Sequence, residues 1–158
     1  MNTSFDLYAE TNPAFCAAVL AEFCESFRDR IDASPSMIIA YPVLPIAMSE
    51  DMAPSFAGTN VNTGFAVWLY RSPWVLEGLA QRVNTTLAIT TDAIKFGCLA
   101  HLLHLGEDGL LSSQSRKIPK TRTDGTNNPA FGRARSLGAW IAGAGSLRAV
   151  MEGFGVSV

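Results

Sequence analysis

The strongest constraint on the fold is an apolar stripe near the start of the chain, in which a large side chain recurs every four residues. The stripe consists of Phe15, Val19, Phe23, Phe27 and Ile31. Asn12 is a good N-cap and Pro13 fits the first helical position. Ser34 ends the helix, because a residue before proline, here Pro35, avoids helical angles. We therefore expect a helix of about 18 residues with one buried face.

Similar start and stop residues predict further helices along the chain. They are expected over residues 37–41, 74–83, 90–105, 129–142 and 147–152. Pro42 and Pro45 argue against a central strand, so we expect the 37–41 helix to be followed by a turn at Leu44-Pro45. Residues 65–70 fit either a helix or an extended segment.

The fold class we predict is mainly α, a compact helical domain with a short β-hairpin near residues 110–120. Gly106 is expected to end the 90–105 helix, and residues 107–109 form the turn before the hairpin. One domain spans residues 1–158, with an N-terminal arm at 1–10 and a basic loop at 115–128. A helix, a turn and a short strand leading into basic residues also fit a winged helix, which stays open as the alternative.

The composition predicts apolar surface that another chain covers. Charged residues make up 16% of the 158 residues and hydrophobic residues 48%, whereas an average soluble domain has about 25% charged residues. Contiguous apolar surface of this kind marks interaction sites. The cover is either a partner or a second copy, and the alternative is a monomer rich in alanine and glycine.

Nothing in the sequence predicts a membrane span or a secretory signal. The longest uncharged apolar stretch, residues 37–48, contains two prolines and is shorter than the ~20 residues that a spanning helix needs. Residues 1–10 carry two acids and no base. Three cysteines, an odd number in apolar helical patterns, suit a reducing compartment. We expect a cytoplasmic protein.

Basic side chains gather between residues 116 and 135, where they face a single acid, Asp124. They are Arg116, Lys117, Lys120, Arg122, Arg133 and Arg135. Such a stretch is a candidate contact for nucleic acid or an acidic partner, and a solvated loop is the alternative. It lacks interleaved aromatic residues, so contact with phosphates irrespective of sequence is favoured over base stacking.

No motif for phosphate binding, dinucleotide binding, serine hydrolysis or zinc proteolysis occurs. We therefore predict a protein that is not an enzyme and that uses no metal or cofactor. A metal site at Cys98, His101 and His104 is the alternative, because a helix with steps of three could bring these ligands together.

Four large residues have both a structural and a functional interpretation. Trp68, Trp74 and Trp140 are expected in the core, with an interface position as the alternative. Arg82 is expected to stabilise the C-terminal carbonyls of the 74–83 helix. The alternative is that Arg82 holds a carboxylate from elsewhere in the fold.

The order and spacing of short motifs carry a family resemblance from about residue 11 to residue 156. The motifs are Asn12-Pro13-Ala14, Leu44-Pro45, Trp68-Leu69, Arg82, Thr90-Thr91, Ile94 with Gly97, Gly109-Leu110, Leu137-Gly138-x-Trp140 and Phe154-Gly155-Val156. This series resembles the middle component of ABC three-component (ABC-3C) systems.

The resemblance implies an adaptor encoded beside a Rad50- or SMC-like ABC ATPase and a third, effector-like component. Such systems are thought to act in bacterial conflict, for example against phages or plasmids. The adaptor would bridge the ATPase and the third component and could meet DNA through the complex. The alternative function is a DNA-binding module that uses the basic stretch without sequence preference.

Overall fold

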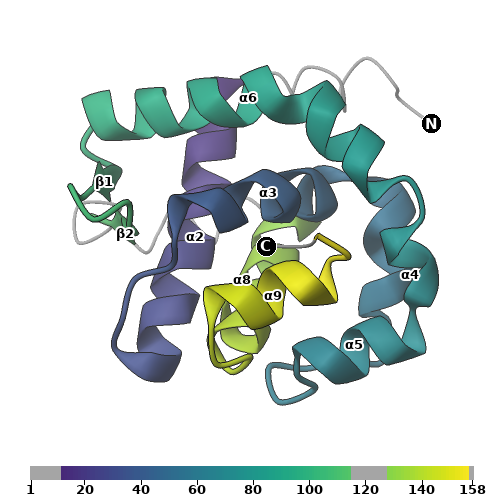
Figure 1. The fold of residues 1–158 in the computed structure, drawn as a ribbon. Helices are drawn as coiled ribbons and strands as arrows, with labels where there is room; N and C mark the ends of the chain where they lie inside the picture. The colour runs from purple at the N-terminus through teal and green to yellow at the C-terminus, as the bar shows by residue number, and fades with distance from the viewer. Residues whose placement is uncertain (1–11, 115–127, 157–158) are drawn as a thin grey trace.

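The computed structural model describes residues 12–114 and 128–156, and it is mainly α with one short hairpin (Figure 1), as predicted. The predicted N-terminal arm and nearly all of the predicted basic loop lie outside these residues. In chain order the elements, with η for a 3-10 helix, are α2 (Pro13–Ile31), η1 (Met37–Ile39), α3 (Ala40–Met48), η2 (Glu50–Met52), α4 (Ala53–Phe56), α5 (Phe65–Arg71), η3 (Pro73–Leu76), α6 (Leu79–Leu99), β1 (Leu103–Leu105), β2 (Leu111–Ser113), α8 (Pro129–Ala142) and α9 (Leu147–Gly153). Helix α6 crosses one side of the molecule, with the hairpin at one end and α4 and α5 at the other (Figure 1).

Helix α2 forms where the apolar stripe predicted it and is the main core element. The side chain of Asn12 accepts hydrogen bonds from the backbone N–H groups of Ala14 and Phe15. The helix ends at Asp32, which adopts left-handed angles. Phe23 of the stripe is fully buried, whereas Ile31 at the end is exposed. Local capping and periodicity therefore predicted the start and the buried face of this element, whereas it ends at Ile31, before the predicted stop at Ser34.

Helix α8 packs along α2 at a glycine. A Cβ atom at Gly138 would lie 2.5 Å from the carbonyl oxygen of Phe23, so only glycine permits this separation of the helices. Two polar contacts join the same helices: Ser26 donates to the carbonyl of Arg135, and Arg135 pairs with Glu22. Gly138 therefore sets the central helix–helix distance of the fold.

Two of the three tryptophans lie in the core, as predicted. Trp68 and Trp140 are fully buried with ring centroids 5.4 Å apart, and Phe56 stacks on Trp140. The indole N–H of Trp140 donates to the carbonyl of Asn60 at 2.8 Å. The expectation was wrong for Trp74, which lies partly exposed on η3. The aromatic cluster ties α4 and α5 to α8.

The region around the two prolines differs from the prediction, because a helix spans them. Helix α3 runs from Ala40 to Met48 and contains both Pro42 and Pro45. Pro42 lies in the first turn, where backbone N–H groups have no intrahelical partner, so it disrupts nothing. Pro45 removes one helical hydrogen bond, but both prolines are buried, and this packing against the core compensates for the lost bond.

Residues 79–99 form one helix, not the two that were predicted. The break before it lies at Gly78, which has a φ of +68° and thus left-handed angles. Within this helix the hydroxyls of Thr85 and Thr86 donate to carbonyls four residues earlier, which satisfies them inside the helix.

The hairpin lies earlier in the chain than predicted. Helix α6 ends in a Schellman motif at His101, whose φ is +58°: Leu102 N–H bonds to Gly97 O, and His101 N–H to Cys98 O. Residues 103–105, predicted as helix, are therefore strand β1, which pairs with β2. Gly106 belongs to the hairpin turn instead of the helix end. The prediction failed because a histidine rarely adopts the left-handed angles that end a helix, whereas a glycine such as Gly106 commonly does.

Among the described residues, no helix combines the length and the apolar character that crossing a bilayer requires.

Candidate functional site

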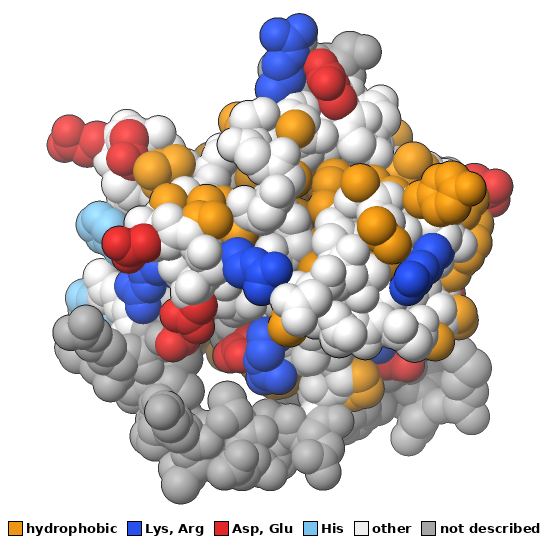
Figure 2. All heavy atoms as spheres, turned by 90° about the horizontal axis from the view of Figure 1, so that it is seen from below, with side chains coloured by type: hydrophobic (Ala, Val, Ile, Leu, Met, Phe, Trp, Pro, Cys, Tyr) orange, Lys and Arg blue, Asp and Glu red, His pale blue; other side chains and the backbone are white. Residues whose placement is uncertain are grey.

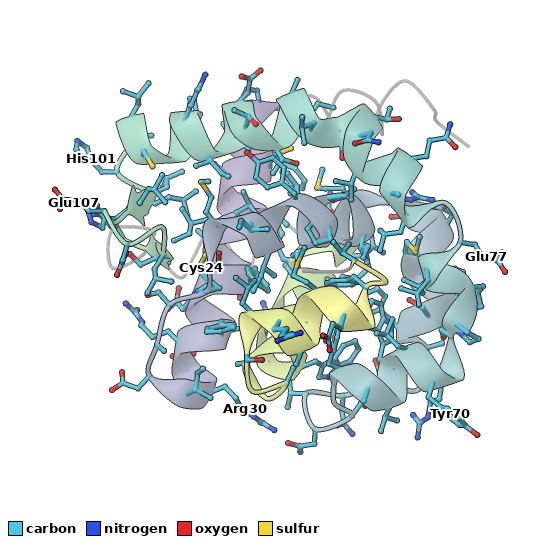
Figure 3. All side chains as sticks on the ribbon, viewed as in Figure 1. Cys24, Arg30, Tyr70, Glu77, His101 and Glu107 are labelled. Carbon is cyan, nitrogen blue, oxygen red and sulfur yellow. The ribbon has the colours of Figure 1, made fainter. Side chains whose placement is uncertain are left out.

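An exposed apolar corner is the clearest candidate surface. We call it the α5–η3 corner and define it by Val67, Tyr70, Trp74 and Leu76. Tyr70 is 88% exposed, and its side chain points away from the molecule (Figure 3). Figure 2 shows hydrophobic side chains gathered on this side of the molecule. Exposed aromatic residues in such a patch are typical of protein–protein contacts.

The second candidate is a hollow of about 630 Å³ between α3 and the first half of α6, which we call the α3–α6 hollow. Its apolar lining comes from α2, α3 and α6: Cys16, Leu44, Pro45, Met48 and Ile89. Its charged lining is Glu50, Asp51, Glu77 and Arg82. An apolar floor with a few polar groups at the mouth is the usual form of a ligand or peptide site.

Arg82 lies at the start of α6, so its predicted role at a helix C-terminus was wrong and the alternative is correct. Its guanidinium donates to both carboxylate oxygens of Asp51 and, at 2.8 Å, to Ser49 Oγ. This bidentate pair joins η2 to α6 and forms one wall of the hollow. The family-motif positions Leu44, Pro45 and Arg82 thus meet at one place, although Arg82 lies far from the other two in the sequence.

Most of the remaining family-motif positions are structural. Asn12 and Pro13 open α2, Trp68 and Trp140 form the aromatic cluster, and Gly138 joins α2 to α8. One further position is Gly97. A Cβ there would come within 2.5 Å of a Leu103 side-chain carbon, so this glycine lets the hairpin pack on α6.

The basic stretch is only partly within the described residues. Arg116, Lys117, Lys120 and Arg122 lie outside them. Arg133 is 6% exposed: its Nε donates to the carbonyl of Ala47 at 2.7 Å, and its Nη2 pairs with Glu50. Arg135 pairs with Glu22 on α2. The structure therefore places these two bases in contacts within the fold, and Arg133 in particular fastens α8 to the end of α3.

The alternative metal site does not assemble. Cys98 lies in the last turn of α6, His101 follows the helix and His104 lies on β1, so the three do not share a helix face. Within residues 12–114 and 128–156, no three or more histidine, cysteine or acidic side chains are grouped to hold a metal ion. Among the other thiols, burial raises the pKa of Cys24 to about 12, which keeps it protonated and unreactive.

Sequence reasoning predicted exposed apolar surface but located neither candidate surface as a whole. The corner had a local indication, because residues 65–70 contain no charge in a chain already short of charge. The hollow had one indication, the alternative that Arg82 holds a carboxylate from elsewhere in the fold, but the sequence did not identify Asp51, which lies 31 residues from Arg82.

The fold and these surfaces define the class of protein: a small, mainly helical chain whose described part carries two candidate binding surfaces, the α5–η3 corner and the α3–α6 hollow. Over residues 3–158 the chain matches the family described as ABC-three component (ABC-3C) system Middle Component 3. It belongs to that family, so the resemblance found in the sequence is confirmed. No curated protein and no solved structure matches the chain. The winged-helix alternative stays a prediction.

Proposed function

We propose that this chain is a non-enzymatic adaptor that bridges a Rad50/SMC-like ABC ATPase and an effector-like component of its system. The system would act in bacterial conflict, against phages or plasmids. We place the complex in the cytoplasm, a reducing compartment that suits the three thiols. The proposal follows from the family, in which a middle component implies two further components.

The observation that carries the proposal is the α5–η3 corner. Exposure of Tyr70 and Trp74 to water does not stabilise a monomer, whereas burial of aromatic side chains by a partner contributes strongly to binding free energy. Arg71 and Glu77 flank the corner, and neither forms an ion pair within the described part of the chain. Opposite charges at the rim of an apolar centre support specific docking of a partner.

The test measures binding of the purified chain to the ABC ATPase and to the third component of the same system. The double variant Tyr70→Ser with Trp74→Ser should lose at least about tenfold in affinity for one of them, as expected for aromatic hot spots. Tyr70→Ser alone, at an almost fully exposed position, should show part of this loss without affecting folding. Ile38→Ser, an exposed apolar position on η1, is the matched control.

Two results would contradict the proposal, the first its function and the second its docking surface. One is that the wild-type chain binds neither component in calorimetry. The other is that the double variant binds both as tightly as Ile38→Ser does, which would refute the corner as the docking surface and leave the adaptor function standing. Retention on DNA at low salt, lost steeply as salt rises, would instead favour the DNA-binding alternative.

A further inference from the structure

We propose that the α3–α6 hollow binds a basic side chain, lysine or arginine, presented by a partner chain. The partner would be the ABC ATPase or the third component, and in this respect the inference rests on the proposed adaptor function.

The hydroxyl groups that line the hollow have already donated their protons. Ser49 donates to the carbonyl of Pro45 at 2.7 Å, Thr85 to that of Gln81 at 2.8 Å, and Thr86 to that of Arg82 at 2.9 Å. A hydroxyl has one proton to give and two lone pairs to accept with. These groups can therefore only accept further hydrogen bonds, which disfavours an occupant that needs donors.

Most of the guanidinium of Arg82 is already engaged within the fold. Both terminal nitrogens of its guanidinium are bonded to Ser49 or Asp51, and its Nε, which has no partner among the described residues, is buried. Its charge is neutralised by Asp51. The guanidinium keeps two protons without a partner among the described residues, one on Nη2 and that of the buried Nε, and the amide of Gln81 is a further donor, exposed at the mouth.

The carboxylates of the lining outnumber the guanidinium, three against one. Asp51 is neutralised by Arg82, and Glu50 is bridged by Arg133. Glu77 is exposed and forms no ion pair in the described part of the chain. The hollow thus keeps one uncompensated negative charge at its mouth, beside three hydroxyl groups that can only accept.

The apolar floor defines the rest of the occupant. Leu44, Met48 and Ile89 offer hydrocarbon surface beneath the charged mouth. Lysine and arginine combine a long aliphatic stem with a cationic end that carries only donors. Such a side chain places its stem on the floor and its charge against Glu77. The uncapped first turn of α6 would attract an anion, because helix N-termini favour negative charge. The three carboxylates of the lining would repel it.

The first experiment uses small probes and needs no partner. Backbone amide shifts of the full chain are followed while n-butylammonium, which mimics a lysine side chain, is added; n-pentanol and inorganic phosphate are the comparison probes. The amine should shift the amides of residues 85–89 more than either comparison probe does. Glu77→Gln should abolish the difference between the amine and pentanol, whereas Glu107→Gln on the hairpin turn, at the far side of the molecule (Figure 3), should not.

The second experiment measures the affinity of the same variants for the ABC ATPase and the third component. Glu77→Gln should weaken one complex by about two- to fivefold at low salt, the range of exposed charge pairs, and the effect should fade at high salt. Glu107→Gln should change neither complex.

The outcomes separate the two proposals. Equal shifts with pentanol or phosphate, or shifts unchanged in Glu77→Gln, would overturn the site for a basic side chain. Partner binding that is unaltered by Glu77→Gln would overturn its use by a partner. Amine shifts at the hollow without any partner binding would support the site and refute the adaptor function.

Discussion

Replacing Gly138 by alanine tests the contact that sets the distance between α2 and α8. The added Cβ would lie 2.5 Å from Phe23 O, 2.9 Å from Ser26 Cβ and 3.0 Å from Phe27 N. Two of these atoms belong to the backbone of α2 and cannot move alone, so the helices must separate by roughly 1 Å to restore ordinary contact distances. Overpacking of this kind costs ~1–3 kcal/mol.

Gly132 provides a control in the same helix. A Cβ at this exposed position meets no atom within 4 Å, so Gly132→Ala should gain up to ~1 kcal/mol from helix propensity alone. Gly138→Ala receives the same gain. The difference in unfolding free energy between the two variants therefore isolates the contact, and we expect Gly138→Ala to be less stable by ~1–3 kcal/mol.

Urea unfolding, followed by the fluorescence of the buried tryptophans, measures this difference. The slope of free energy against urea should be the same for both variants, because the surface exposed on unfolding hardly changes. In thermal unfolding the midpoints should differ by about 2–4 °C for each kcal/mol. If Gly138→Ala is as stable as Gly132→Ala, the close approach of the two helices is not as described and the reasoning fails.

Three further predictions concern buried polar groups. Arg133→Ala should destabilise the fold by ~2–3 kcal/mol, because Ala47 O and the packing lose a buried partner, whereas Arg135→Ala, at a half-exposed pair, should cost less than ~1 kcal/mol in urea unfolding. Burial raises the pKa of Cys24 from 9.0 to about 12, so its stability contribution is complete below pH 9 and is lost as pH rises toward 12. That loss, up to ~1.4 kcal/mol per pH unit, should be absent in Cys24→Ala when pH-dependent unfolding is compared. Thr90 is fully buried and its hydroxyl has no partner among the described residues, so Thr90→Val should raise the thermal midpoint by removing an unsatisfied group worth ~1 kcal/mol; a lower midpoint would contradict this.

Elements with local capping residues were predictable from the sequence. Asn12, Asn128 and Ser146 accept hydrogen bonds from the first turns of α2, α8 and α9, and each helix begins where these residues predicted. Capping depends on side chains within a few residues, so the sequence contains all of the relevant information.

Elements that depend on tertiary contacts were not predictable in the same way. Helix α3 retains Pro45 because the core buries it, and α6 ends at His101 because the hairpin packs against Gly97. The hollow depends on Arg82 meeting Asp51 across 31 residues. The family resemblance named Leu44, Pro45 and Arg82, but only the structure shows that they surround one hollow.

The geometry of α6 bears on how such a small chain can bridge two partners. The α5–η3 corner and the α3–α6 hollow adjoin at residues 76–78, since Leu76 belongs to the corner and Glu77 lines the hollow. A single partner can therefore occupy both, with its aromatic contacts on the corner and its basic side chain in the hollow. At the other end of α6, Leu99 is 82% exposed and Leu105 on β1 is also exposed. The 21 residues of α6 separate the two ends by about 30 Å, and Figure 3 places Glu77 and His101 at opposite sides of the molecule. Two partners at the two ends would not compete for the same surface, which is the condition that an adaptor has to meet.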